Sequence, residues 1–360
     1  MFDRRRFVLV SLVTVATLAA SLASSFAVAD EIERRSTKTP LRGTITAENS
    51  TGITVKPSQT GKTGDVQVPI DDVAEVRYDG AAGLALRAAA GLERAGEYEK
   101  AADQYQKAAA AGGSEFVAQS IAFGQARAAA AAALATRERL DEAIRGLEDF
   151  RTKYPASRHH FALHELLGRL LLEKKNTAAA RQAFAELDKA TWPELKMRAA
   201  NWDGRALVQE GKLDEAEAKF DIVAALPAKT PGEKIEQQQA LLARCDCLVA
   251  QKKHDEAVAT LRRIIQESPP EDAELQAAAW NNLGDVLRAA DKPKDALLAY
   301  LRVDLLYSTE RTAHAKALFV TAQLWDRLGR PADATASRDK LKRLYPNSPW
   351  AKLSSGDGSS

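Results

Sequence analysis

Cysteine is nearly absent from this chain, with two residues in 360. Cys245 and Cys247 lie two apart in a helical pattern, so their side chains point about 200° apart around the helix axis. That separation excludes a disulfide between them. We expect both to be small buried residues, and with no cysteine near the N-terminal segment we expect no lipid anchor there.

A surplus of charge of either sign is also missing. The sequence has 51 Lys and Arg against 49 Asp and Glu. Without residues 1–29 it would have 48 of each, because that segment holds three Arg and one Asp. A balanced charge gives no support for nucleic-acid binding or long-range electrostatic steering, so we expect no nucleic-acid partner.

Long hydrophobic runs are confined to the N-terminus. Arg4, Arg5 and Arg6 precede an apolar run from Phe7 to Ala20, and Ala27-Val28-Ala29 matches a cleavage site. Residues 1–29 therefore indicate a signal peptide and a periplasmic protein. An uncleaved membrane anchor is the alternative, which the Ser, Thr and Ala content disfavours. The segment leaves the Sec and twin-arginine routes open.

Motifs of catalysis and cofactor binding are missing. There is no G-x-S-x-G nucleophile motif and no cysteine in a reactive setting. TGKTG (60–64) lacks the earlier glycine and the following helix that a phosphate-binding loop requires. We therefore expect no catalytic residues and no cofactor.

Several histidines are candidate metal ligands by their spacing. His160 and His164 are four apart on an expected helix, with His159 and Glu165 beside them. Such spacing can hold a metal ion, but no HExxH motif and no matching cysteine or carboxylate cluster accompanies it. We expect packing or surface histidines and no metal site.

Residues 40–80 contain short, β-branched, nearly alternating runs separated by turn residues, such as GITVKP and DVQVPI. Four short strands are expected, in a small sheet or half-barrel of SH3-like or Sm-like type. Residues 30–39 are expected to be a linker. So small a unit buries little by itself and should pack against the segment that follows it.

From residue 81 the pattern becomes helical and repeats. Small residues recur at intervals of 36 to 42, at Ala101, Ala143, Ala180, Ala216, Ala257, Ala296 and Ala334. Four residues after each, apart from Arg338, stands a large apolar residue: Tyr105, Leu147, Phe184, Phe220, Leu261 and Tyr300. Twelve residues before each stands another small residue: Ala89, Ala131, Gly168, Gly204, Cys245, Gly284 and Ala322. Such spacing lets two helices of a hairpin approach closely.

This pattern resembles the tetratricopeptide repeat, with WNNLGDVLRAADKPKDALLAY (280–300) as its best copy. The resemblance implies a mostly α chain, a right-handed α-solenoid of about seven helical hairpins over residues 81–350. Residues 351–360 are expected to be a disordered tail. The repeat period is longer than the family's usual period of about 34 residues.

The family's concave groove implies the candidate binding residues. Positions two, five, nine and twelve of each first helix place nine side chains along it: Glu165, Arg169, Arg198, Asn201, Arg205, Asp246, Asn281, Asp285 and Arg288. We expect a basic patch near repeats three and four that turns acidic at repeat five. The chain lacks the Lys/Asn set with which the family clamps peptide C-termini.

The resulting expectation is a non-catalytic, exported scaffold that binds a protein or an acidic or extended peptide segment in the cell envelope. The repeat junctions YPAS (154–157) and YPNS (345–348) are similar to those of bacterial envelope proteins. The alternatives are a self-assembling structural module and an accessory metal-binding protein or enzyme. The oligomeric state and the partner's identity stay open.

Overall fold

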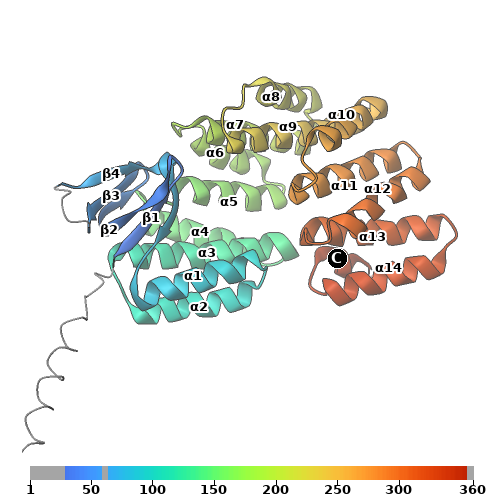
Figure 1. Ribbon diagram of the computed structural model, residues 1–360. Coiled ribbons are helices and arrows are strands. Elements are labelled where there is room, and N and C mark those ends of the chain that lie inside the picture. Colours follow the sequence, from blue (N-terminus) through green and yellow to red (C-terminus); the bar gives the residue numbers. More distant parts are fainter. Residues whose placement is uncertain (1–28, 59–63, 355–360) are drawn as a thin grey trace, which may run out of the picture.

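The computed structural model describes residues 29–58 and 64–354. All but the last residue of the predicted signal segment 1–29 and most of the TGKTG stretch lie outside these residues. Within them, a small sheet precedes a long curved array of helices (Figure 1). Among the described residues no helix combines the length and apolar character needed to cross a bilayer.

The sheet has five antiparallel strands in the order β4-β3-β2-β1-β5. The strands are β1 Asp30–Arg34, β2 Thr37–Asn49, β3 Gly52–Pro57, β4 Val66–Pro69 and β5 Val73–Arg77, with a 3₁₀ turn η1 Ile70–Asp72 before the last. The predicted β-unit is thus confirmed, with five strands instead of four. Residues 30–39, expected to be a linker, form β1 and the start of β2. The single buried Ile32 stands among charged neighbours, which concealed this strand.

A bulge in β2 changes which side chains face the core. Leu41 and Ile45 alternate toward the buried face, as a period of two requires. The register with β3 shifts between Ile45 and Ala47, so Glu48 is buried in place of Ala47. The consequence is a carboxylate placed against the helices.

The helices form seven antiparallel hairpins, which confirms the predicted solenoid. The hairpins are α1 Gly80–Arg94 with α2 Tyr98–Ala111, α3 Glu115–Thr136 with α4 Leu140–Lys153, α5 His160–Glu173 with α6 Thr177–Leu187, α7 Pro193–Gln209 with α8 Leu213–Ala225, α9 Pro231–Ala250 with α10 His254–Glu267, α11 Ala273–Ala289 with α12 Pro293–Leu306, and α13 Arg311–Arg327 with α14 Pro331–Leu344. A short helix, α15 Pro349–Ser354, follows. We call the first helix of each hairpin its A helix and the second its B helix.

Every hairpin turn contains a residue with left-handed backbone conformation. Gly211 and Gly329 have φ of 77° and 74°, which glycine adopts without strain. Lys175, Lys252 and Asp291 occupy the same position in other hairpins with φ near 60°. The turn geometry is therefore common to the repeats although its residue type is not.

The sheet caps the first repeat, as expected for a unit too small to be stable alone. Ile32, Ile53 and Val55 of the sheet share one hydrophobic cluster with Ala89 and Tyr105 of the first hairpin. Glu48 extends this contact, because its carboxylate accepts hydrogen bonds from Tyr78 Oη at 2.6 Å and from Arg158 Nε at 2.8 Å. The sheet is thus joined to the junction between α4 and α5 as well.

The C-terminal end of the array is ordered further than the sequence indicated. Residues 351–354, expected to belong to a disordered tail, form part of α15, and Ala351 is buried. Trp350 packs on Phe319 of α13, with ring centroids 5.4 Å apart. These contacts with α13 hold the helix. In Figure 1 the last repeats lie next to the end of α3, where Lys352 pairs with Glu138 at 2.5 Å.

Candidate binding groove

The A helices line the concave side of the array. Among the described residues, consecutive A helices pack against each other at five of six steps, whereas no two consecutive B helices do so to the same extent. In a curved array, elements that approach more closely lie on the inner side. The exception is the step from α5 to α7, which are well separated in Figure 1.

Side chains bridge that step, and Trp202 on α7 is at their centre. Its ring stacks on Phe184 with centroids 5.4 Å apart and an interplanar angle of 11°. The guanidinium carbons of Arg169 and Arg205 each lie 5.4 Å from its centroid. Trp202 Nε1 donates to Glu165 Oε1 at 3.3 Å. The structure thus brings together three predicted groove residues around an indole.

The two arginines beside Trp202 lack carboxylate partners. Within residues 29–58 and 64–354, Arg169 has no ion pair, and Arg205 donates only to the amide oxygen of Gln239, at 3.2 Å. Burial lowers the pKa of Arg205, and repulsion from Arg169 acts in the same direction. Arginine nevertheless stays charged in proteins. Two cations therefore stand close together with donors available to an anion.

Arg198 is different, because it is already neutralised. Its guanidinium contacts Glu236 at 2.7 Å, Glu194 at 2.9 Å and Glu165 at 3.5 Å. Glu194 is also paired with Arg35 from the β1–β2 turn, at 3.1 Å. The basic character expected near repeats three and four thus belongs to Arg169 and Arg205 and not to Arg198.

Asn201 and Asn281 lie between repeats and are not available on the groove surface. Both are 3% exposed. Asn201 Nδ2 donates to the backbone carbonyl of Glu236 at 2.9 Å, and Asn281 Nδ2 donates to that of Ala313 at 2.9 Å. Each bond joins an A helix to the next one. The family register predicted that both asparagines lie on the groove face of their A helices. The next repeat stacks on this position and covers their side chains.

The acidic part of the groove begins at Asp246 on α9. This side chain is exposed to water and makes no hydrogen bond or ion pair within the described parts of the chain. Neighbouring protein atoms partly desolvate its carboxylate and raise the pKa of Asp246, while Arg205 acts in the opposite direction. Asp246 is therefore an unpaired acceptor within electrostatic reach of Arg205.

Asp285 and Arg288 on α11 complete the predicted set. Asp285 accepts a hydrogen bond from Tyr300 Oη at 2.6 Å and pairs with Lys316 of α13 at 2.5 Å. Arg288 is exposed and lies 3.5 Å from Asp285. Asp285 is thus occupied, whereas Arg288 stays largely accessible.

Trp202 and Gln239 were missed by the sequence analysis. Ala216 and Ala296 are the small residues of the B helices in the repeats that contain Trp202 and Trp280. Fewer residues separate Trp202 from Ala216 than separate Trp280 from Ala296. A tryptophan displaced from the repeat's packing position was the signal that could have identified it. Gln239 gave no such signal, because its contact with Arg205 depends on how α9 stacks on α7.

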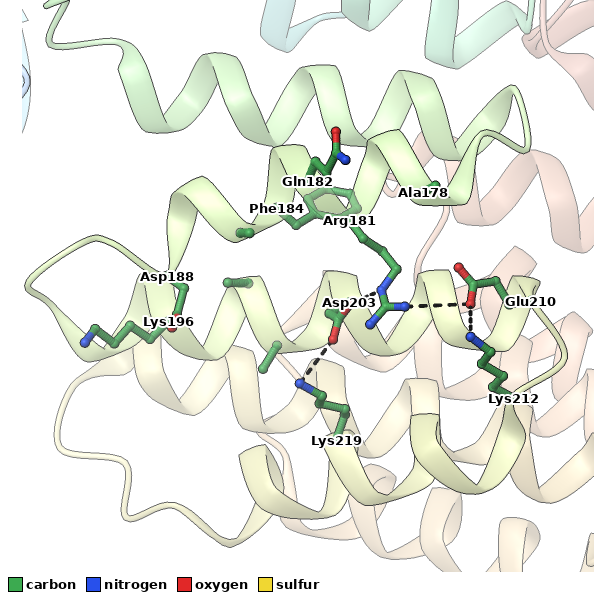
Figure 2. A pocket seen from close by; sticks show the side chains of 13 residues that line it. Ala178, Arg181, Gln182, Phe184, Asp188, Lys196, Asp203, Glu210, Lys212 and Lys219 are labelled. Atoms are coloured by element: carbon green, nitrogen blue, oxygen red, sulfur yellow. Dashed lines mark hydrogen bonds and ion pairs between the residues drawn. The ribbon is translucent and has the colours of Figure 1, made fainter.

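A separate depression of about 660 Å³ lies on the side of the B helices, between α6, α7 and α8 (Figure 2). Its central charges pair with one another. Asp203 contacts Arg181 at 2.6 Å and Lys219 at 3.1 Å, and Glu210 contacts Lys212 at 2.8 Å. Because these charges are already satisfied, the depression is a weaker candidate than the groove.

Comparison with known proteins supports the fold assignment. Residues 203–272 match the family model of the tetratricopeptide repeat. No curated protein matches the chain in sequence. A Rap protein in complex with Competence and Sporulation Factor is 13% identical, with a TM-score of 0.50 over 75% of this chain and 77% of its own. A tetratricopeptide repeat protein from Parabacteroides merdae ATCC 43184 is 15% identical, with a TM-score of 0.49 over 76% of this chain and 99% of its own.

The match covers one part of the helical array, and the hairpins on either side of it repeat the same arrangement. The described helices therefore form a solenoid like that of tetratricopeptide-repeat proteins, and a small antiparallel sheet precedes it.

Proposed function

We propose that this chain is a non-catalytic scaffold whose concave groove binds an extended peptide segment or a protein partner. The observation that carries the proposal is the pair of unpaired guanidinium groups of Arg169 and Arg205 beside the ring of Trp202. Aromatic and arginine side chains in a partly desolvated position are the residues that dominate binding interfaces. The partner's matching group is a carboxylate or another anion.

The charges define a direction for the bound segment. Arg169 and Arg205 lie on α5 and α7, and the unpaired Asp246 lies one A helix further along, on α9. An acidic residue of a partner would contact the arginines through charge-assisted hydrogen bonds. A basic residue a short distance along the same segment would face Asp246. The proposed ligand is therefore a segment with acidic and basic groups in that order along the groove.

One solved structure of similar fold supports this proposal. The Rap protein with a TM-score of 0.50 is described in complex with Competence and Sporulation Factor. A protein of similar fold therefore forms a complex with such a factor, and the chemistry of a binding site can vary on one fold.

The proposed location is the periplasm of a bacterial cell envelope, after export. Support comes from the sequence of residues 1–29, with its arginines, apolar run and Ala27-Val28-Ala29 site. The envelope-type junctions YPAS and YPNS point in the same direction.

The groove is tested by selecting binders from a displayed library of short random peptides and measuring their affinities by fluorescence anisotropy. We expect the selected peptides to be enriched in Asp and Glu. The double variant Arg169→Gln/Arg205→Gln should bind them roughly 10- to 100-fold more weakly, since a hydrogen bond to a charged group contributes about 1.5–3 kcal/mol. Arg302→Gln is the matched control. Arg302 also lies over a tryptophan ring, that of Trp280, but it belongs to a B helix, α12.

Equal affinity of the double variant and the Arg302→Gln control would contradict the groove proposal. If no peptide is selected and the chain associates with itself in sedimentation velocity, the alternative of a self-assembling module is favoured. The observation behind that alternative is α12, where Leu298, Leu305 and Leu306 are 62%, 75% and 61% exposed.

A further inference from the structure

The third repeat contains a cluster of potential metal ligands away from Trp202 and its arginines. His160 and His164 lie one turn apart on α5, and Glu186 lies near the end of α6. One ligand atom from each residue lies within 4.8 Å of the others. His160 Nε2 lies 3.5 Å from Glu186 Oε2.

His164 contains a buried polar atom that nothing satisfies. The residue is 6% exposed. Its Nδ1 is buried without a hydrogen-bond partner in the described parts of the chain. An unsatisfied buried acceptor or donor costs about 1–3 kcal/mol, so such an atom in a native structure calls for an explanation. A simple ion pair between His160 and Glu186 leaves this atom unexplained.

We propose that His160, His164 and Glu186 form a binding site for a divalent transition-metal ion, with zinc as the best match. Two imidazoles and one carboxylate are a known ligand set for zinc. With zinc–ligand distances of about 2.0–2.2 Å, neighbouring ligands of a tetrahedral ion are about 3.4 Å apart. The His160–Glu186 separation of 3.5 Å matches this value. The remaining ligand atoms of the three residues lie within 4.8 Å of one another.

Two cations near the cluster limit the affinity. Lys189 Nζ contacts Glu186 Oε1 at 2.6 Å, which leaves Oε2 as the oxygen that faces His160. Arg151 on α4 adds positive potential at His164. With three protein ligands, the fourth position of the ion is filled by water or by a group of a partner. The bound ion should therefore exchange with solution, unlike the ion of a closed structural zinc site.

The sequence predicts no metal site at these histidines, because no third ligand has a matching spacing. Glu186 belongs to the next helix along the chain, and no helical or hairpin motif specifies its spacing from His164. Packing of α6 against α5 brings it to the pair of histidines. The present proposal does not depend on peptide binding in the groove, and its outcome leaves that function unaffected.

The site is tested with tag-free protein by isothermal titration with Zn²⁺ and by visible absorption after addition of Co²⁺. We expect one equivalent of Zn²⁺ to bind, and Co²⁺ to give the intense bands of four-coordinate cobalt. His164→Gln and Glu186→Gln should each weaken Zn²⁺ binding by more than about tenfold. His254→Gln is the matched control, because His254 begins α10 outside the cluster.

Three results overturn the proposal. The first is Zn²⁺ binding to the triple variant His160→Gln/His164→Gln/Glu186→Gln that equals binding to the unaltered chain. The second is a cobalt spectrum of six-coordinate type in the unaltered chain. The third is an equal loss of affinity in the His254→Gln control. Circular dichroism of each variant confirms that the helices are intact, so that a folding defect is not read as loss of a ligand.

Discussion

At the scale of residues, the contact between a glycine in an A helix and an aromatic ring in its B helix recurs along the array. Gly168, Gly204 and Gly284 face Phe184, Phe220 and Tyr300 of their own hairpins. A Cβ added at these glycines would lie 2.3, 2.6 and 2.6 Å from the ring. These distances confirm that the small residues of the repeat let the helices approach.

The close approach predicts a cost for adding one methyl group. Gly284→Ala should lower the free energy of unfolding by about 1–3 kcal/mol, because Tyr300 must move in a packed core. Gly146→Ala in α4 is the matched control, since a Cβ there meets nothing within 4 Å. That control should stabilise the chain by about 0.5–1 kcal/mol. Urea unfolding followed by circular dichroism measures both, and equal effects of the two substitutions would show the prediction to be wrong.

The cysteines are packing residues of the same kind. Cys245 takes the position of Gly284 in its repeat, and both Cys245 and Cys247 are buried free thiols, as expected. Burial raises the pKa of Cys245 to about 12 and that of Cys247 to about 11. A thiol that stays protonated is a poor nucleophile and a poor metal ligand.

At the scale of elements, polar contacts hold neighbouring hairpins in register. Asp304 at the end of α12 contacts His314 Nε2 and Lys340 Nζ, both at 2.6 Å. His314 Nδ1 in turn lies 2.7 Å from Tyr345 Oη. The group joins α12, α13 and the end of α14 in one network. Within it, Asp304 is the member that faces two donors.

This network predicts a pH dependence of stability. Burial would raise the pKa of Asp304, but the hydrogen bonds from His314 and Lys340 outweigh it and lower the pKa. A lowered pKa contributes stability that is present above the unfolded value, about 3.9, and is lost as pH falls through the folded value. Asp304→Asn should therefore lower the melting temperature at pH 7, and the difference should shrink below about pH 4.

Thermal melts between pH 7 and 3 measure the effect of Asp304→Asn. Asp339→Asn is the control, because Asp339 is exposed on α14. A difference between the unaltered chain and Asp304→Asn that stays constant or grows on acidification would contradict the assignment.

At the scale of the molecule, the sheet and the last helix connect parts of the array that are far apart in sequence. The sheet reaches the α4–α5 junction through Glu48 and Arg158, and it reaches α7 through Arg35 and Glu194. At the other end, α15 approaches the end of α3 through Lys352 and Glu138, which are 38% and 61% exposed. An exposed ion pair contributes about 0–1 kcal/mol. The second connection is therefore weak.

A weak end contact predicts that the array opens easily. Glu138→Lys should increase the radius of gyration measured by small-angle X-ray scattering, and about 1 M salt should do the same by screening the pair. The melting temperature should change little, since this pair contributes little to stability. Glu142→Lys is the control, because Glu142 pairs with Arg139 in its own hairpin. Identical scattering of both variants and the unaltered chain would contradict the prediction.

The sequence by itself determined the repeat, its hairpins and the presence of a small β-unit. The reason is that helix packing depends on local spacing: a small residue, a second small residue twelve positions later and a ring four beyond it lie in one hairpin. The family register that the resemblance implies supplied Arg169 and Arg205 as groove candidates, which stay a prediction. Local spacing did not identify β1, because one buried Ile32 among charged residues is too short a pattern.

Only the tertiary structure decided which charged groups are free. Arg198 on α7 and Glu236 on α9 belong to different repeats, and Asn201, also on α7, donates a hydrogen bond to the same glutamate. Stacking of one repeat on the next selects these partners, and no spacing within a repeat specifies them. The same holds for Glu186 beside His160 and His164, and for the β2 bulge that turns Glu48 inward. Helical periodicity is a property of neighbours in the chain, whereas ion pairing and ligand geometry depend on residues that only folding brings together.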